Sequence, residues 1–169
     1  GLDVVIVNPT MVYGAGDVHR QGSSVIVQMA RQKIPAYVRG GMNLVHIQDV
    51  VDGHLAALEF GSTGERYILG GQNMTHETML KMIASIVGKP APPLMMPTWL
   101  LRAAAKPAVA LKGMIPLPVQ PEVLALAGLY FYFDTSKAQQ VLHLEPPRPV
   151  MDALREAFAW FQSVGALPA

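Results

Sequence analysis

The chain has 169 residues, 13 Lys and Arg against 12 Asp and Glu, a net charge of +1 and no cysteine. This length suits a single domain, and a net charge near zero provides no field that would attract nucleic acid or an anionic membrane. Without cysteine there is no disulfide, thiolate nucleophile or cysteine-based metal site. No uncharged run reaches the roughly 20 residues that span a bilayer, and the first residues lack the pattern of a signal peptide. We therefore expect a globular, cytoplasmic protein.

Residues 2–9 form a short apolar, β-branched run that ends at Pro9. Such a run predicts a strand buried on both faces inside a parallel sheet. This strand needs a neighbour on each side and helices above and below it, yet here it comes first. We therefore expect sequence on its N-terminal side to supply the rest of the sheet. Without that sequence the strand would expose apolar surface and an unpaired edge.

The following elements alternate between strands and helices, which predicts an α/β fold. Asp49 is the expected N-cap of one helix and Gly61 its end; Thr75 opens the capping sequence of the next helix, which ends at Gly88. Gly40 and the glycine after it indicate a turn. The expected segments are a glycine-rich loop at 10–24, helices at 25–33, 49–60 and from 75 to 88, and strands at 36–39, 44–47 and 66–69.

Most of the 14 prolines lie in residues 90–149, where they break the chain into short pieces. Residues 149–164 predict a closing amphipathic helix with Leu154, Phe158 and Phe161 directed inward. The other expected helical pieces are 98–105, 122–129 and 134–142, the last with Asp134 as its cap. We expect one partial domain in which residues 1–90 hold strands of the sheet, 90–149 a small, mostly helical lobe and 149–169 the closing helix.

The chain shows no self-sufficient catalytic constellation. The zinc-protease, P-loop and serine-hydrolase motifs are absent, and the Gly14-Ala15-Gly16 run lacks the third glycine of a dinucleotide fingerprint. His46 and His54 flank two carboxylates, but a hydrogen-bonded strand histidine and a solvated helix histidine are the simpler interpretation. We therefore predict no metal site.

Three segments resemble the extended short-chain dehydrogenases/reductases, also called the NAD-dependent epimerase/dehydratase family. They are NPTMVYGAGD at 8–17, LVHIQDVVDGHLAALE at 44–59 and GERYILGGQNMT at 64–75, in the family's order and spacing. The KIPAYV and NLVH runs at 33–38 and 43–46 are similar to the dihydroflavonol-4-reductase-like branch, which includes hopanoid-associated sugar epimerases.

The resemblance implies the C-terminal part of a Rossmann-type, NAD(P)-binding parallel sheet plus a small, mostly helical substrate-binding lobe. In this family the G-x-x-G-x-x-G loop and the catalytic Tyr-x-x-x-Lys lie upstream of the Asn-Pro loop, and neither occurs in this chain. We therefore expect the chain alone to be inactive. The parent protein would be an NAD(P)-dependent sugar epimerase/dehydratase or ketone reductase, with NAD or NADP as cofactor. Its partners would be a sugar, ketone or alcohol substrate and either an N-terminal half or a homo-oligomer that covers the sheet edge.

The resemblance also implies which residues of this half face the ligands. One residue departs from the family pattern: Met42 stands where nucleotide-sugar epimerases often carry an arginine that pairs with the diphosphate. This difference favours a substrate that is less charged than a nucleoside-diphosphate sugar. The expected cofactor contacts share the loop after the first strand: Pro9, Thr10, Met11 and Val12. The expected substrate contacts are aromatic or basic side chains further along: Tyr13, Arg20, Tyr37 and His46.

Two alternatives stay open. A non-catalytic nucleotide-sensing or scaffold relative would keep the fold without turnover, and the upstream Tyr-x-x-x-Lys would distinguish it from an enzyme. A membrane-surface module is a third possibility, because residues 99–112 combine Trp99 and leucines with basic residues. Pro107 interrupts that run, which favours a core role for its apolar residues.

Overall fold

A computed structural model describes residues 1–18, 24–100, 103 and 128–168. Its helices are α1 (Ser24–Ala30), α2 (Ile47–Phe60), α3 (His76–Val87), α6 (Ser136–Val141) and α7 (Val150–Ser163). Its strands are β1 (Ile6–Pro9), β2 (Met11–Tyr13), β3 (Ala36–Val38), β4 (Gly41–His46), β5 (Arg66–Leu69), β6 (Gln72–Thr75), β7 (Leu94–Met96) and β8 (Tyr130–Phe131).

Parallel pairing dominates the described strands. β1 pairs with β5, β2 with β4 and β3 with β7, all in parallel, and β8 adds to β4 in the same sense. β6 pairs with β4 antiparallel, on the edge opposite β2. The short β-branched runs therefore form small sheets that helices connect, and the expected α/β class is confirmed.

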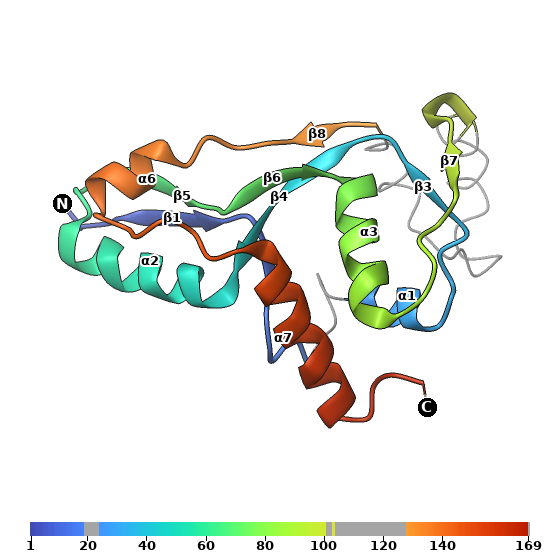
Figure 1. Ribbon diagram of the computed structural model, residues 1–169. Coiled ribbons are helices and arrows are strands. Elements are labelled where there is room, and N and C mark those ends of the chain that lie inside the picture. Colours follow the sequence, from blue (N-terminus) through green and yellow to red (C-terminus); the bar gives the residue numbers. More distant parts are fainter. Residues whose placement is uncertain (19–23, 101–102, 104–127, 169) are drawn as a thin grey trace, which may run out of the picture.

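Two hydrophobic clusters hold these sheets. In the first, α1, α3 and α7 bury Ile26, Ile83 and Phe161 around Leu44 of β4 (Figure 1). In the second, α2 packs on β1 and β5. Its approach depends on Gly53, because a Cβ there would lie 2.7 Å from a methyl group of Leu69.

Several expected boundaries are confirmed. The strand at 66–69 is β5, α2 stops at Gly61, and α3 stops at Gly88, whose φ of 71° is the left-handed conformation that favours glycine. The Thr75 hydroxyl accepts the Thr78 N–H at 3.1 Å, as a capping sequence requires. The closing helix is α7, in which Leu154 and Phe161 are fully buried while Phe158 is only half-buried.

The expectation that the first strand is buried on both faces is wrong for this structure. Val4 is 41% exposed and Ile6 37%. Among the described strands only β5 pairs with β1, and α2 covers one face, where Val5 and Val7 pack. The alternate residues, which point to the other face, have no layer against them in the described part of the chain.

Other differences are local. Residues 11–13 of the expected loop form β2, and Gly41 begins β4 instead of ending a turn. α2 begins two residues before Asp49, and its N-cap is His46. The N-cap position of α6 is Thr135, one residue after the expected Asp134, although the Asp134 carboxylate does accept the Ser136 N–H. β6, β7 and β8 were not expected, because short polar or proline-flanked runs carry little periodicity. The helical pieces expected at 98–105 and 122–129 lie largely outside the described residues.

Candidate functional site

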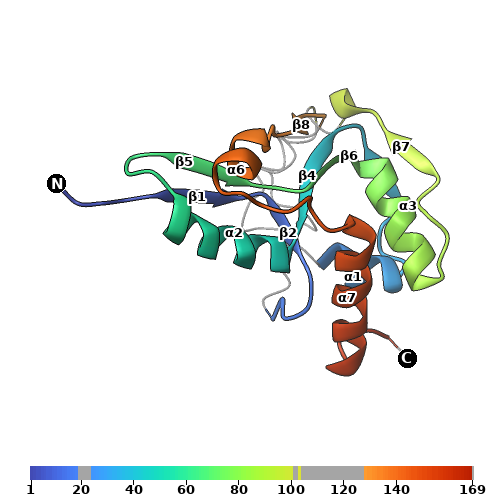
Figure 2. The same cartoon turned by 60° about the vertical axis from the view of Figure 1, so that its left-hand side comes forward.

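Two parallel strands end side by side and their continuations then separate. Pro9 at the end of β1 lies opposite Leu69 at the end of β5. Beyond them β2 and β6 run along opposite edges of β4, and Figure 2 shows β2 turning down from the end of β1. We call residues 9–12 and 69–73 the strand fork. In open α/β sheets, ligands bind outside the carboxyl ends of strands, where neighbouring connections diverge.

The buried side chain of Asn43, on β4, ties both arms of the fork together. Its Oδ1 accepts the Thr10 hydroxyl at 2.8 Å and the Gly71 N–H at 2.9 Å. Its Nδ2 donates to Asn73 Oδ1 at 2.7 Å and to the Gly71 carbonyl at 3.3 Å. Asn43 is only 2% exposed, so these partners replace water completely. The amide therefore determines how far the two arms stand apart.

The glycine pair after β5 makes room for this amide. A Cβ at Gly70 would lie 2.5 Å from Asn43 Oδ1, and one at Gly71 would lie 2.4 Å from the Leu44 carbonyl oxygen. Both distances are shorter than atoms tolerate, so only glycine lets the arm close on β4. In the sequence this pair simply follows the expected strand at 66–69. Its contact with Asn43 cannot be predicted from a local pattern, because Asn43 and Gly71 are 28 residues apart.

A groove continues from the fork toward the segment after β8. Asn73 Nδ2 donates to the Phe133 carbonyl at 3.1 Å, and the Phe133 N–H donates to Asn73 Oδ1 at 3.1 Å. The groove has a volume of about 490 Å³, and its lining holds the Asp134 carboxylate among neutral hydroxyl, amide and aromatic groups. This lining suits hydrogen bonding to a polar ligand of low charge.

The four residues expected at the cofactor lie along one arm of the fork. Pro9 and Met11 are exposed, whereas Thr10 and Val12 are half-buried. The Thr10 N–H donates to the Leu69 carbonyl at 3.0 Å, and Val12 packs against the cluster below α2. The arm therefore presents alternate side chains to the outside, and its cofactor role stays a prediction.

Tyr13, an expected substrate contact, lies in the core. It is 3% exposed, and its hydroxyl donates to the Met79 sulfur at 3.8 Å. Burial first, and the charge of Asp17 second, raise the pKa of this phenol far above its usual range, so it stays neutral. In this position the ring helps to anchor β2, and its substrate role stays a prediction.

The other expected substrate contacts lie apart from one another. His46, 4% exposed at the end of β4, accepts the Gln48 N–H on Nδ1 at 3.0 Å, and its Nε2 is 3.2 Å from Glu156 Oε2 on α7. Both ring nitrogens are thus occupied in joining α2 to α7. Tyr37 lies half-buried in β3, near the opposite end of β4, and Arg20 lies outside the described residues.

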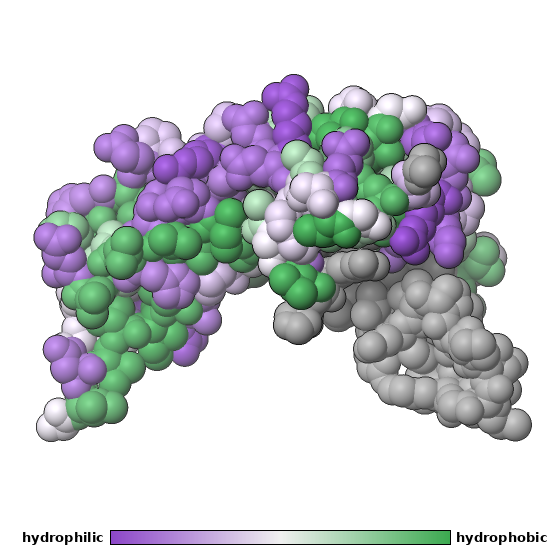
Figure 3. All heavy atoms as spheres, turned by 90° about the horizontal axis from the view of Figure 1, so that it is seen from below, coloured by the Kyte–Doolittle hydropathy of each residue, from purple (hydrophilic) through white to green (hydrophobic). Residues whose placement is uncertain are grey.

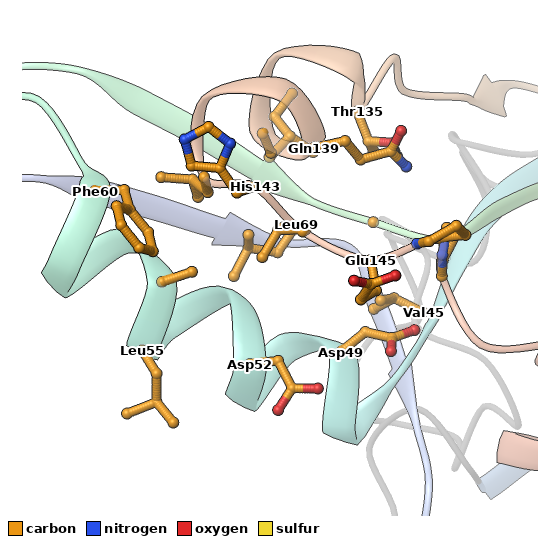
Figure 4. A pocket seen from close by; sticks show the side chains of 18 of the residues that line it. Val45, Asp49, Asp52, Leu55, Phe60, Leu69, Thr135, Gln139, His143 and Glu145 are labelled. Carbon is orange, nitrogen blue, oxygen red and sulfur yellow. Dashed lines mark hydrogen bonds between the residues drawn. The ribbon is translucent and has the colours of Figure 1, made fainter.

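A second cavity, of about 520 Å³, separates α2 from the segment before α7 (Figure 4). Its floor includes Val45 and Leu69, and its rim carries Asp49 and Asp52. Arg148 closes the rim: its guanidinium contacts Asp49 and lies 2.9 Å from Asp52 Oδ2. These charges are paired with each other. In the described part of the chain, no group of three or more His, Asp or Glu is placed to hold a metal ion.

The rim predicts a pH-dependent contribution to stability. The Gln48 amide first, and Arg148 second, hold the pKa of Asp52 below its usual value. A lowered carboxyl pKa stabilises the fold above the unfolded value of about 4, and this contribution is lost as the pH falls through the folded value. We therefore expect Arg148→Met to lower the urea midpoint at pH 7, and the difference from the unmodified chain to shrink as the pH falls below about 4. The control is Arg155→Met, which removes only an exposed pair to Asp152; an Arg148 effect independent of pH would contradict the assignment.

Comparison with known proteins agrees with this geometry. The model of the "NAD dependent epimerase/dehydratase family" matches residues 1–70. The chain is 37% identical to a "Putative dihydroflavonol 4-reductase" of Synechocystis sp., over 98% of this chain and 50% of that protein. It is 29% identical to "Sterol demethylase protein B" of Methylococcus capsulatus, over 99% of this chain and 52% of that protein. The chain thus spans about half the length of the curated relatives that it matches.

A solved structure shows the same fold. The crystal structure of a nucleoside-diphosphate-sugar epimerase from Pseudomonas aeruginosa superposes with a TM-score of 0.84 at 32% identity, over 99% of this chain and 51% of that one. The expected partial Rossmann-type fold is therefore confirmed. None of the helices in the described ranges is long and apolar enough to cross a membrane.

Proposed function

Because the chain belongs to the NAD dependent epimerase/dehydratase family, we propose that it forms the ligand-walling half of an NAD(P)-dependent sugar epimerase/dehydratase or ketone reductase. The observation that carries this proposal is the strand fork. Asn43 fixes Thr10 at the carboxyl ends of β1 and β5, where ligands of open α/β sheets bind. When bound, the nicotinamide would exchange a hydride with the substrate: in an epimerase or dehydratase it would accept a hydride and return it, and in a ketone reductase its reduced form would donate one.

The fork suits the wall of a nicotinamide ring. Pro9 has no N–H and a fixed φ, so the arm begins rigidly. The Thr10 hydroxyl is already donated to Asn43, which fixes the side chain before any ligand arrives. Met11 is 39% exposed and offers an apolar, adaptable surface. We assign the cofactor contacts to these residues and to Val12.

The described residues of the fork include no group that would exchange a proton near neutral pH. The polar side chains of the fork, Thr10 and Asn73, and the Asn43 side chain that joins its two arms carry hydroxyl or amide groups that are neutral near pH 7. A proton-transfer group would then have to lie outside the fork, and the absence of the family's Tyr-x-x-x-Lys motif from this sequence supports our proposal that the chain alone does not turn over. We place the substrate beside Asn73 in the groove, with residues 90–149 as the substrate lobe. The groove lining holds one carboxylate, that of Asp134, and Met42 stands where nucleotide-sugar epimerases often carry an arginine for the diphosphate. Both features favour a sugar, ketone or alcohol without a diphosphate.

The test is a chimera with the first half of the Synechocystis relative fused ahead of this chain. We expect the chimera to bind NADH or NADPH, followed by nicotinamide fluorescence, and Met11→Trp to weaken binding at least tenfold because the larger ring enters the proposed site. The same change at Leu94, an exposed residue of β7, is the control. Cofactor binding that Met11→Trp leaves unchanged would contradict the proposed wall. Cofactor binding without reduction or epimerisation of any sugar or ketone would favour the non-catalytic sensor.

A further inference from the structure

The cavity between α2 and the segment before α7 reaches into the second hydrophobic cluster. Val45, Leu69, Ala138 and Leu142 line its floor, and each of these side chains is at most 2% exposed. The volume of about 520 Å³ is far larger than the voids that close packing leaves inside a domain, and it is in the range of small-molecule sites. Apolar walls gain dispersion contacts from an apolar body that fits between them. The floor therefore suits the apolar part of a ligand.

An aromatic pair stands at one end of the cavity. Phe60, the last residue of α2, meets the His143 ring edge to face, with the ring centroids 5.3 Å apart (Figure 4). His143 follows α6 with a φ of 52°, a left-handed conformation that favours glycine. A histidine at this position costs backbone strain, and it places a ring against Phe60. Both rings line the cavity, so this end suits an aromatic body.

The charged groups of the lining are mostly acidic. It holds four carboxylates, those of Asp49, Asp52, Glu59 and Glu145, and one guanidinium, that of Arg148. Arg148 contacts Asp49 and Asp52. Within the described residues, Glu59 and Glu145 make no hydrogen bond or ion pair. Figure 4 shows Glu145 toward the end that Asp49 occupies, away from the aromatic pair. The uncompensated negative charge attracts a cation and repels an anion.

We propose that this cavity binds a small organic cation, a protonated amine on an aromatic or other apolar body. The body lies on the floor against Phe60 and His143, and the ammonium group lies beside Glu145. Among the described residues, the lining includes part of β5 and none of β1, and it meets the strand fork only at Leu69 and Gly70. The site is therefore separate from the loop that begins at Pro9. The proposal does not rest on the proposed function, because binding here needs neither NAD(P) nor turnover.

The test measures the binding of naphthylmethylamine to the 169-residue chain by isothermal titration calorimetry at pH 7. This probe joins an aromatic body to an amine that is protonated near neutral pH. We expect a dissociation constant of about 1 mM or lower. Two partial probes should bind at least tenfold more weakly. Naphthylacetate has the aromatic body with the opposite charge, and butylamine has the charge with a small apolar body.

Matched variants separate the cavity from the rest of the surface. Figure 3 shows further apolar side chains on the underside of the molecule, so each change needs a control outside the lining. Leu55→Ser, in the lining, should weaken binding of the cation at least threefold, whereas Leu58→Ser, exposed on the same helix and outside the lining, should not. Glu59→Gln combined with Glu145→Gln should weaken it at least fivefold, whereas Glu77→Gln on α3 should not.

His143→Gly tests the aromatic end without a risk to the fold, because glycine accepts the left-handed conformation at this position. We expect this variant to keep or raise the thermal midpoint of the unmodified chain. Its binding of naphthylmethylamine should nevertheless be at least threefold weaker, because the ring that meets Phe60 is gone.

Each outcome decides the proposal. Tighter binding of the cation than of both partial probes, weakened by the cavity variants and kept by the two controls, supports it. Equal or tighter binding of naphthylacetate overturns it, as does binding of the cation that all cavity variants retain. Absence of binding to the folded chain also overturns it. Thermal unfolding of every variant shows that it is folded, so a loss of binding reports on the cavity itself.

Discussion

Replacement of Asn43 by leucine should destabilise the chain by about 3 kcal/mol or more. Leucine has a similar volume but no polar atom, so the Gly71 N–H and the Thr10 hydroxyl lose their shared acceptor inside the protein. Each buried group left without a partner costs about 1–3 kcal/mol. The Asn73 side chain also loses its donor from Asn43. Urea unfolding, followed by far-UV circular dichroism, measures the difference.

The matched control is the same substitution at Asn8, an exposed residue of β1. A surface change of this kind should stay within about 0.5 kcal/mol. Amide hydrogen exchange adds a local readout, because loss of the tie between the arms should speed exchange at Thr10 and Gly71 more than in α3. An Asn43 variant as stable as the Asn8 variant would show that the network contributes nothing to the fork.

Replacement of Phe161 by alanine should destabilise the chain by about 3–5 kcal/mol. The ring is 0% exposed and lies in the cluster where α7 meets α3 and β4. Truncation removes the buried ring and leaves a cavity that rigid neighbours fill only in part. Because α7 also carries Glu156, the partner of His46, the loss should weaken the anchoring of the β4–α2 junction.

The comparison for this prediction is Gln162→Ala, one residue further along and exposed. Alanine favours a helix, so this variant should be neutral or slightly stabilising. Thermal and urea unfolding of both variants give the difference. A Phe161 cost below about 1 kcal/mol would mean that α7 is not part of the cooperative core.

Local patterns in the sequence determined much of the fold. The four residues of β5 form a strand-like run that ends at two glycines. The Thr75 side chain makes the hydrogen bond that begins α3, and Gly88 adopts the left-handed backbone conformation that ends it. The three motif segments resemble the family whose model matches residues 1–70, in the order and spacing of that family. These features depend on neighbouring residues only, so they can be read without the fold.

The N-cap of α2 is a feature that local sequence patterns do not predict correctly. Asp49 satisfies the usual rule for an N-cap, yet His46 caps the helix, because the histidine also reaches Glu156 and Asp49 is engaged with Arg148. Residues about 100 positions away therefore decide between two acceptable local choices. Tyr13 likewise matches a motif expected at a substrate, but packing against Met79 places it in the core.

The sequence by itself determined the α/β class, the family and the position of the loop that begins at Pro9. Only the tertiary structure decided what holds that loop and which side of the molecule is open. Asn43 ties Thr10 to Gly71 across three separate stretches of chain, and the exposed apolar residues of α2, such as Leu58, can be recognised as exposed only once the buried face of that helix is known. Hydrogen bonds and burial between distant residues depend on their arrangement in space, which no local pattern of residues contains.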